Sequence, residues 1–163
     1  MKRLFLAIFL LGMLIPALFV ARAQRGGGVN PPDAVFWSAQ RIRELAETMK
    51  PRVDPITHNA AMALIPSVNM IYREGDSGSE IHEKLADIIF VHEGEGAIVV
   101  GGKMIGGKQD RPDEIRGTSI EGGTRYSIAK GDSIYIPANM AHQFFVETGK
   151  HFVISIVKVP PQS

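Results

Sequence analysis

The feature that most constrains the fold is a series of short apolar runs, rich in β-branched residues, that starts at about Met62. Turn residues separate the runs, and the Gly-Gly pairs at 101–102, 106–107 and 122–123 are typical of hairpin turns. About eight short strands separated in this way predict a sandwich or a barrel. We therefore expect an all-β barrel domain over residues 60–160.

One amphipathic helix is expected before the strands, in a segment over residues 33–51. Ser38 is suited to the N-cap of this helix, and Pro51 to its end. The apolar residues that recur at helical spacing are Ile42, Leu45, Ala46 and Met49. We expect this apolar stripe to pack on the barrel or on a partner subunit.

Residues 1–23 have the pattern of a secretory signal peptide, with basic residues before an apolar run over residues 4–20. The small residues Ala21 and Ala23 suit a signal peptidase. The alternative is an uncleaved membrane anchor, since the apolar run is about as long as a short membrane span. Glycine and proline within the run favour cleavage after Ala23, and thus a periplasmic or secreted protein without membrane contact. Residues 24–32, rich in glycine and closed by two prolines, are expected to form a flexible leader.

The composition excludes several kinds of function. The 18 Lys and Arg residues balance 17 Asp and Glu residues, which argues against a nucleic-acid partner, because such proteins cluster positive charge on one face. The chain has no cysteine, and this excludes disulfides, thiolate nucleophiles and sulfur-ligated metals. Any metal must therefore be held by imidazole nitrogen and by oxygen.

The residues suited to chemistry lie in two segments, SEIHEKLADIIFVHEGEG and GDSIYIPANMAHQFF. In the first, Glu80 and His82 are two apart on a strand, so their side chains project from the same face, and Asp87 opens the next strand. In the second, a bend at 137–139 leads to His142, on an otherwise apolar strand face. A single histidine on an apolar face is more often part of the core than a ligand, so the two segments must be interpreted together.

Together the two segments resemble the paired motifs of the cupin superfamily, over residues 62–159. The first motif is matched by Glu80-Ile81-His82, four residues, Asp87, six residues and Gly94. The second motif is matched by Gly131, five residues, Pro137-Ala138-Asn139, two residues and His142. The departures from the motifs are Glu80 for histidine, Asp87 for glutamate, Asn139 for glycine and Val146 for asparagine. The resemblance implies a cupin-type jelly-roll barrel with one N-terminal helix.

The resemblance further implies that one divalent metal ion is bound inside the barrel by Glu80, His82, Asp87 and His142. Nitrogen and oxygen ligands suit Mn, Fe, Zn, Ni or Co, and they do not choose among these metals. The short side chain of Asp87 reaches the metal directly or through a water molecule. The alternative is a barrel that has kept the fold and lost the metal, with the polar groups hydrogen-bonded at its mouth.

The function implied by the resemblance is that of a metal-dependent enzyme acting on a small oxygen-rich molecule, of the oxygenase, isomerase or lyase type. Glu80 or Asp87, whichever does not bind the metal, would shuttle a proton. The alternatives are a non-catalytic module that binds a small ligand or metal, and a purely structural interaction domain. Many proteins of this fold are homodimers, so a homodimer is expected.

The remaining polar residues are expected to have structural roles. The mixed-sign segment 108–116 is expected to be a solvated loop, with a loop that covers the mouth of the barrel as the alternative. By alternation, His92 should point away from the strand face that carries Asp87. The residues that could line the cavity and bind a polar substrate, but suit packing or the surface better, are Tyr72, Arg125 and Tyr126.

Overall fold

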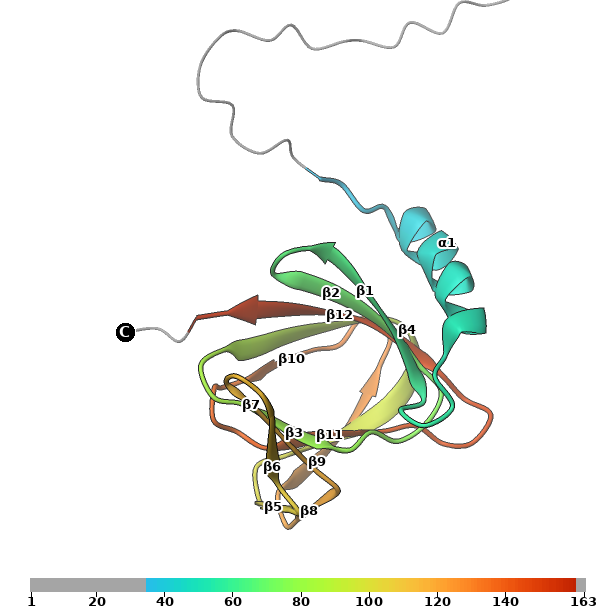
Figure 1. The fold of residues 1–163 in the computed structure, drawn as a ribbon. Helices are drawn as coiled ribbons and strands as arrows, with labels where there is room; N and C mark the ends of the chain where they lie inside the picture. Colours follow the sequence, from blue (N-terminus) through green and yellow to red (C-terminus); the bar gives the residue numbers. More distant parts are fainter. Residues whose placement is uncertain (1–34, 161–163) are drawn as a thin grey trace, which may run out of the picture. The chain divides into compact units, whose positions relative to one another are not determined.

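Strand pairing folds the chain from Asn59 to Val159 into one strongly curled sheet and a small two-stranded sheet (Figure 1). The computed structural model describes residues 35–160, so the predicted signal peptide (1–23) and leader (24–32) lie outside the described residues. The elements, in chain order, are α1 (Ala39–Met49), the 3₁₀ turn η1 (Lys50–Arg52), β1 (Asn59–Ile65), β2 (Val68–Arg73), β3 (Ser79–His82), β4 (Ala86–Val100), β5 (Lys103–Ile105), β6 (Lys108–Arg111), β7 (Glu114–Gly117), β8 (Ser119–Glu121), β9 (Thr124–Ala129), β10 (Ser133–Ile136), β11 (His142–Phe145) and β12 (Phe152–Val159).

The long strand β4 joins the two halves of the curled sheet. Its first part pairs with β12 and β10, which gives one half the order β1-β2-β12-β4-β10. Its last part, from Glu95 to Val100, pairs with β11 and β9, which gives the other half the order β6-β7-β3-β11-β4-β9. β4 passes between the halves at Gly94, whose φ of 75° and close approach to the carbonyl of His151 leave no room for a side chain. The expected all-β jelly-roll barrel with one N-terminal helix is thus confirmed.

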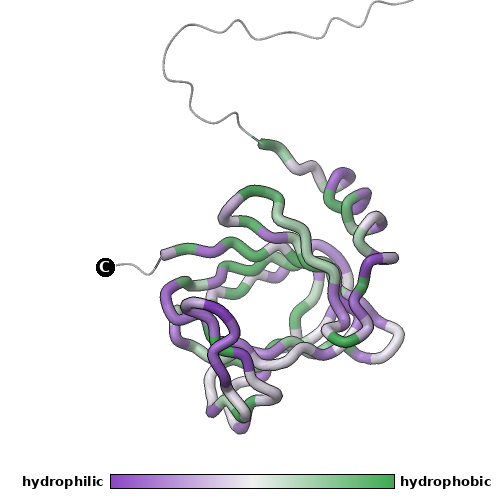
Figure 2. The backbone as a smooth tube through the Cα atoms, in the orientation of Figure 1, coloured by the Kyte–Doolittle hydropathy of each residue, from purple (hydrophilic) through white to green (hydrophobic). Residues whose placement is uncertain are grey.

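The inner faces of the two halves enclose a hydrophobic core. Fully buried members of this core are Ile89, Ile98, Ile136, Phe144, Phe152 and Ile154. Figure 2 shows that hydrophobic residues are frequent along β2, β4 and β12, whereas the β6–β7 region is hydrophilic. Burial of alternate strand positions in such a core provides the main stabilisation of the barrel. Buried polar side chains, among them Asp87 and His142, are therefore exceptions that need a partner.

Helix α1 covers part of the outer face of the β1-β2-β12 half. Ser38 caps the helix by accepting a hydrogen bond from the backbone N–H of Arg41 (3.1 Å), and Pro51 lies in the 3₁₀ turn that follows. The side chains buried at this contact include Ile42, Leu45, Ala46, Met49, Met70, Tyr72 and Val153. The predicted helix, its N-cap and its packing on the barrel are confirmed. Among the described residues, no helix is long and apolar enough to cross a membrane.

Two expectations about the strands are wrong. The sequence predicts about eight strands, and the described residues 35–160 form twelve. The strands that were not predicted, β5, β6 and β7, are three or four residues long, which is too short to show an apolar period. Segment 108–116, predicted as a solvated loop, is instead the hairpin of β6 and β7, and β7 pairs with β3. This hairpin brings charged side chains next to the strand that carries Glu80 and His82.

Candidate metal centre

Strand pairing brings the two chemically suited segments together inside the barrel. β3 carries Glu80 and His82, and the register of β11 with β3 places His142 directly opposite Glu80. The bend before β11 is tied to β3, because the backbone N–H of Asn139 donates to the carbonyl oxygen of His82 (2.8 Å). Asn139 has a φ of 63°, a left-handed conformation that asparagine adopts more readily than most residues, so it can replace the glycine of the motif.

Glu80, His82 and His142 present ligand atoms that are close enough to bind one ion. One ligand atom from each residue lies within 4.8 Å of the other two. Glu80 Oε1 is 3.4 Å from His142 Nε2, and the centroids of the two imidazole rings are 5.4 Å apart. Two imidazoles and a carboxylate form a donor set that suits divalent transition metals and zinc. The residues present therefore fit one divalent metal ion.

Asp87, the fourth predicted ligand, lies beside this triad. Its side chain is 1% exposed, and its Oδ2 lies 3.4 Å from His82 Nε2 and 3.7 Å from His142 Nε2. The other oxygen, Oδ1, lies 2.6 Å from Lys158 Nζ, and Lys158 is the partner of Asp87 in the β12–β4 register. The four predicted ligands thus lie close together, but Asp87 has a cation of its own. Direct binding of metal by Asp87 stays a prediction.

The hydrogen bonding of His142 leaves the lone pair of its Nε2 facing the carboxylates of Glu80 and Asp87. His142 Nδ1 lies 3.2 Å from the carbonyl oxygen of Met140, and because a carbonyl only accepts, we assign the ring proton to Nδ1. In the neutral imidazole Nε2 is then an acceptor, and it faces the carboxylate oxygens of Glu80 and Asp87. His142 Nε2 and Asp87 Oδ2 are buried without a hydrogen-bond partner, whereas Asp87 Oδ1 lies against Lys158. Acceptors that face one another in a buried space require a shared proton or a cation between them.

Sequence analysis missed three charged residues around the triad. Arg116 on β7 lies 3.0 Å from Glu80 Oε2 and 2.6 Å from Glu114 Oε1. Glu114 Oε2 in turn lies 3.6 Å from His82 Nδ1, where it can orient the imidazole. The third residue is Lys158, described above. Glu114 and Arg116 alternate on β7 as Glu80 and His82 do on β3, and this alternation is the only sign of them in the sequence.

The surrounding charges keep the ligands in the forms that bind metal. Burial by itself would raise the pKa of Glu80, but a hydrogen bond and positive charge from His142, when its Nε2 carries a proton, and the charge of Arg116 outweigh burial and hold this pKa well below its ordinary value. Burial, together with the positive charge of Lys158, lowers the pKa of His82 against the opposite effect of the nearby carboxylates. Glu80 is therefore ionised and His82 neutral near neutral pH, as ligation requires.

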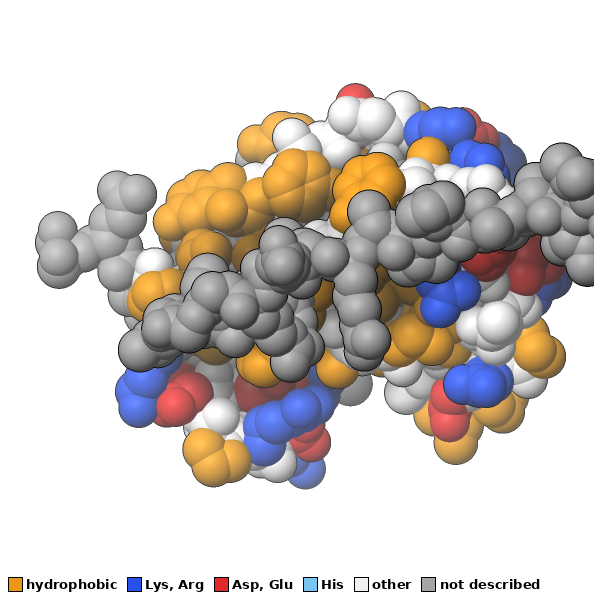
Figure 3. Space-filling model, turned by 90° about the horizontal axis from the view of Figure 1, so that it is seen from above, with side chains coloured by type: hydrophobic (Ala, Val, Ile, Leu, Met, Phe, Trp, Pro, Cys, Tyr) orange, Lys and Arg blue, Asp and Glu red, His pale blue; other side chains and the backbone are white. Residues whose placement is uncertain are grey.

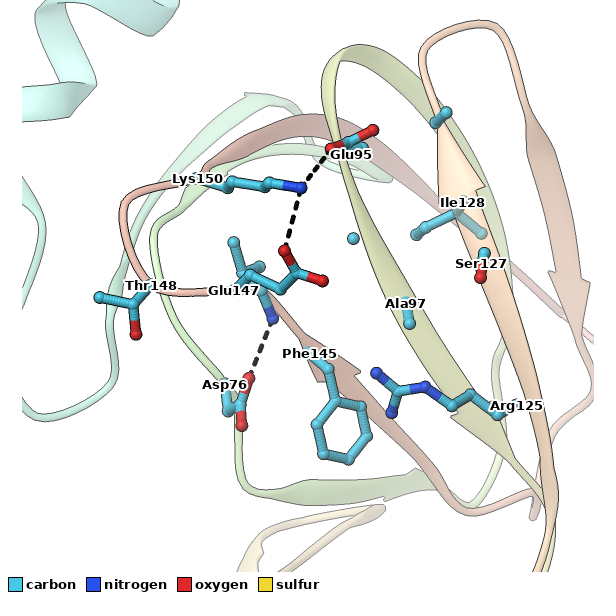
Figure 4. Close-up of a pocket in the computed structure, with 13 residues that line it drawn as sticks. Asp76, Glu95, Ala97, Arg125, Ser127, Ile128, Phe145, Glu147, Thr148 and Lys150 are labelled. Carbon is cyan, nitrogen blue, oxygen red and sulfur yellow. Dashed lines mark hydrogen bonds and ion pairs between the residues drawn. The ribbon is translucent and has the colours of Figure 1, made fainter.

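The other residues predicted as possible cavity residues are placed elsewhere. Tyr72 is buried under α1, and its ring stacks on His151 with 5.1 Å between centroids. Arg125 lies over the ring of Phe145, 4.5 Å from its centroid, and borders a groove of about 670 Å³ along β9, β4 and β11 (Figure 4). Tyr72 and Arg125 thus have the packing roles that the sequence favours. Tyr126 borders a different cavity, between β9 and β10.

Comparison with known proteins shows similarity at the level of the fold. No family model and no curated protein sequence matches the chain. Similar solved structures include the polyketide cyclase RemF from Streptomyces resistomycificus, with 17% identity and a TM-score of 0.45, over 64% of this chain and 68% of that chain. Another is the protein TT1209 from Thermus thermophilus, with 17% identity and a TM-score of 0.48, over 67% of this chain and 89% of that chain.

A third similar structure is a cupin 2 conserved barrel domain protein from Rhodopseudomonas palustris. It has 20% identity and a TM-score of 0.41, over 64% of this chain and 62% of that chain. Cupin barrels are thus among the solved structures that resemble this chain. The strand order and the meeting of the two motifs confirm the cupin-type fold class, and any conclusion about function rests on the residues of the site.

Proposed function

We propose that this chain is a cupin-type metalloprotein that binds one divalent metal ion through Glu80, His82 and His142, with Asp87 beside the ion. We further propose that it acts as an enzyme on a small oxygen-bearing molecule. The observation that carries the proposal is that two buried acceptor atoms, His142 Nε2 and Asp87 Oδ2, have no hydrogen-bond partner. Ligand atoms of three residues within 4.8 Å of one another support the same conclusion.

Each residue of the centre has its own role in this proposal. A bound divalent ion would act as a Lewis acid on an oxygen of the substrate. Glu80 serves as a ligand and not as a proton carrier, because Arg116, 3.0 Å away, helps to keep it ionised. Asp87 accepts a proton that the substrate releases, since its Oδ2 faces both imidazoles while only its Oδ1 lies against Lys158. His142 is oriented by the carbonyl of Met140.

A non-catalytic module, which captures a small ligand or a metal without turnover, is the second candidate function. The observation that favours it is that both carboxylates predicted as proton shuttles form ion pairs. Glu80 lies 3.0 Å from Arg116, and Asp87 lies 2.6 Å from Lys158. A carboxylate next to a cation is a weaker base, which lowers its value in proton transfer. Turnover therefore separates the two candidates, whereas metal content does not.

The metal content of site variants tests the proposed centre. We expect protein purified without chelator to contain about one equivalent of divalent metal, and His142→Ala and Glu80→Ala to lose most of it. His92→Ala is the matched control, because His92 lies outside the triad and hydrogen-bonds Ser155 (2.9 Å). Wild-type metal content in His142→Ala would show that the proposed centre is wrong. Loss of turnover together with metal supports the enzyme, and ligand binding without turnover supports the module.

We also propose that the protein acts outside the cytoplasm after cleavage behind Ala23. The support is the sequence pattern of residues 1–23. Amino-terminal sequencing of the protein recovered from periplasmic and culture fractions tests this, and a chain that starts at Gln24 is expected. Recovery only in the membrane fraction, with the apolar run intact, would instead support the uncleaved anchor.

A further inference from the structure

A cavity of about 580 Å³ opens between β9 and β10. The two strands follow each other in the chain, but each pairs with a different part of β4, and in the described sheet neither pairs with the other. The barrel wall therefore has no backbone hydrogen bonds between β9 and β10, and the cavity lies in this gap. The apolar and aromatic side chains that line the cavity include Val100, Tyr126, Ile128, Ile134 and Met140.

Two lining residues, one on each half of the sheet, lie near candidate ligands. Val100 lies opposite His142 in the β11–β4 register, so the two side chains share the inner face. On the other half, Ile134 lies opposite Ile89, which is on the same face of β4 as Asp87. The inner end of the cavity thus lies at Val100, beside His142, although none of the four candidate ligands is among its lining residues.

The chemistry of the lining favours an apolar molecule. No Lys or Arg lines the cavity, and the carboxylate of Asp132 already accepts a hydrogen bond from the backbone N–H of Ala129 (2.8 Å). Ser127 and Ser133 also line it, but they alternate with Ile128 and Ile134 and so lie on the outer faces of their strands. Met140 contributes a flexible thioether that adapts to the shape of a ligand. Tyr126 and Tyr135 border the opening and are 48% and 56% exposed. Exposed aromatic rings beside an apolar cavity provide flat surfaces on which another ring can stack.

We propose that this cavity is the substrate pocket of the metal centre, and that its substrate is a small uncharged molecule with an apolar ring and a hydroxyl or carbonyl oxygen. The ring packs among the aliphatic side chains and Tyr126, and the oxygen is directed toward His142. This inference rests on the proposed function and narrows its substrate class. A sugar or a polycarboxylate does not fit, because apart from the hydroxyl of Tyr126 the lining that faces the barrel interior has no polar side chain to replace the hydrogen bonds such a molecule makes with water.

The larger groove shown in Figure 4 is a weaker candidate for the substrate pocket. Its residues Ala97 and Ser127 are paired across β4 and β9, on the face opposite to the core residue Ile98. The groove therefore faces away from the metal centre. Its Lys150 forms ion pairs with two glutamates, at 2.6 Å and 2.9 Å, so its charge is already neutralised.

Binding of 2-naphthol, a fluorescent ring compound with one hydroxyl group, tests the inference. Ile134→Trp places an indole ring in the cavity, and we expect it to weaken binding by at least about tenfold in equilibrium dialysis. Its metal content should stay at the wild-type level, since Ile134 is not a ligand. Ile56→Trp makes the same change at a position that is 84% exposed, and it should bind 2-naphthol as the wild type does.

A second variant covers the case in which the indole ring disturbs folding. Tyr126 is half exposed, so Tyr126→Ala removes a stacking surface without placing bulk in the core. We expect it to weaken 2-naphthol binding severalfold, with an unchanged circular dichroism spectrum. Inositol, a polar ring of similar size, should not displace the probe.

The outcomes separate this inference from the proposed function. Equal affinity of wild type, Ile134→Trp and Tyr126→Ala for 2-naphthol, or displacement of the probe by inositol, overturns the pocket whatever the metal content. Binding that is weakened as expected in a protein that holds no metal, even after reconstitution, supports an apolar-ligand site and overturns the metal function. Metal content with no 2-naphthol binding supports the metal centre and overturns the pocket.

Discussion

At the residue scale, the candidate centre depends on which atoms face one another across paired strands. The placement of Glu80 and His82 on one face could be predicted, because alternation depends only on the local chain. Lys158 could not be predicted, since it meets Asp87 only through the register of β12 with β4. The sequence thus supplies the candidate ligands, whereas long-range strand pairing supplies the cations that neutralise them.

Replacing Lys158 with methionine should lower the free energy of unfolding by about 3 kcal/mol, because it leaves a buried carboxylate without its cation. Asp87 is 1% exposed and Lys158 is 20% exposed, so solvent screens this pair weakly. Urea unfolding of metal-free protein measures the change. The double variant Lys158→Met with Asp87→Asn should recover much of the stability. A single variant as stable as the wild type would contradict the importance of this ion pair.

His92 should make stability depend on pH. His92 lies on the face of β4 opposite Asp87, as predicted, and burial lowers its pKa below the ordinary value. The folded protein then binds this proton less readily than the unfolded chain. Stability should be constant above the unfolded-state pKa of about 6.5 and should fall as the pH decreases below it.

The variant His92→Gln checks this pH dependence. It should make the loss of stability on acidification less steep, as measured by urea midpoints from about pH 7 to about pH 5. His58→Gln, at an exposed histidine, is the control variant. The same slope in His92→Gln and in the wild type would show that His92 does not contribute.

At the element scale, long apolar periods could be predicted and short polar strands could not. The helical stripe of α1 spans several turns, and its N-cap and terminal proline gave bounds close to those observed. Most positions of the β6–β7 hairpin are polar or charged, so its sequence resembles that of a solvated loop. Its strand character comes from pairing with β3, which is a tertiary contact.

Met49→Ala tests whether α1 and the barrel unfold together in one cooperative transition. Met49 is 1% exposed in the cluster that α1 shares with β2 and β12, so its truncation should lower the free energy of unfolding by about 2–4 kcal/mol. Trp37, the one tryptophan of the chain, packs on the same cluster and reports on it by fluorescence. Glu47→Ala, on the exposed side of α1, is the control. If the unfolding transitions followed by fluorescence and by circular dichroism were separate, α1 and the barrel would not unfold together.

At the scale of the whole molecule, one edge of the barrel favours the predicted homodimer. β1 is the outermost strand of its half, and its sequence NAAMALI has no charged residue or proline to keep another strand away. Figure 3 shows hydrophobic side chains gathered on the face that is seen from above, the side of β1, β2 and β12 in Figure 1. Two copies of β1 paired antiparallel about Met62 would place Ala61 of one copy opposite Ala63 of the other.

Ala63→Lys tests this homodimer. Ala63 is exposed on β1, so a lysine there would place like charges close together across the two-fold pairing and should convert the dimer to a monomer. Light scattering after gel filtration measures the mass. Thr124→Lys, on exposed strand β9, is the matched control and should remain dimeric. A monomeric wild type at all accessible concentrations would contradict the predicted homodimer.

The central claim is that Glu80, His82 and His142 hold one metal ion, and X-ray absorption at the edge of the bound metal tests it most directly. The account predicts a coordination shell of nitrogen and oxygen with multiple-scattering features of two imidazoles. In His142→Ala these features should fall to those of one imidazole, or the metal should be absent. A metal without imidazole ligands, or a shell that does not change in His142→Ala, would contradict the account.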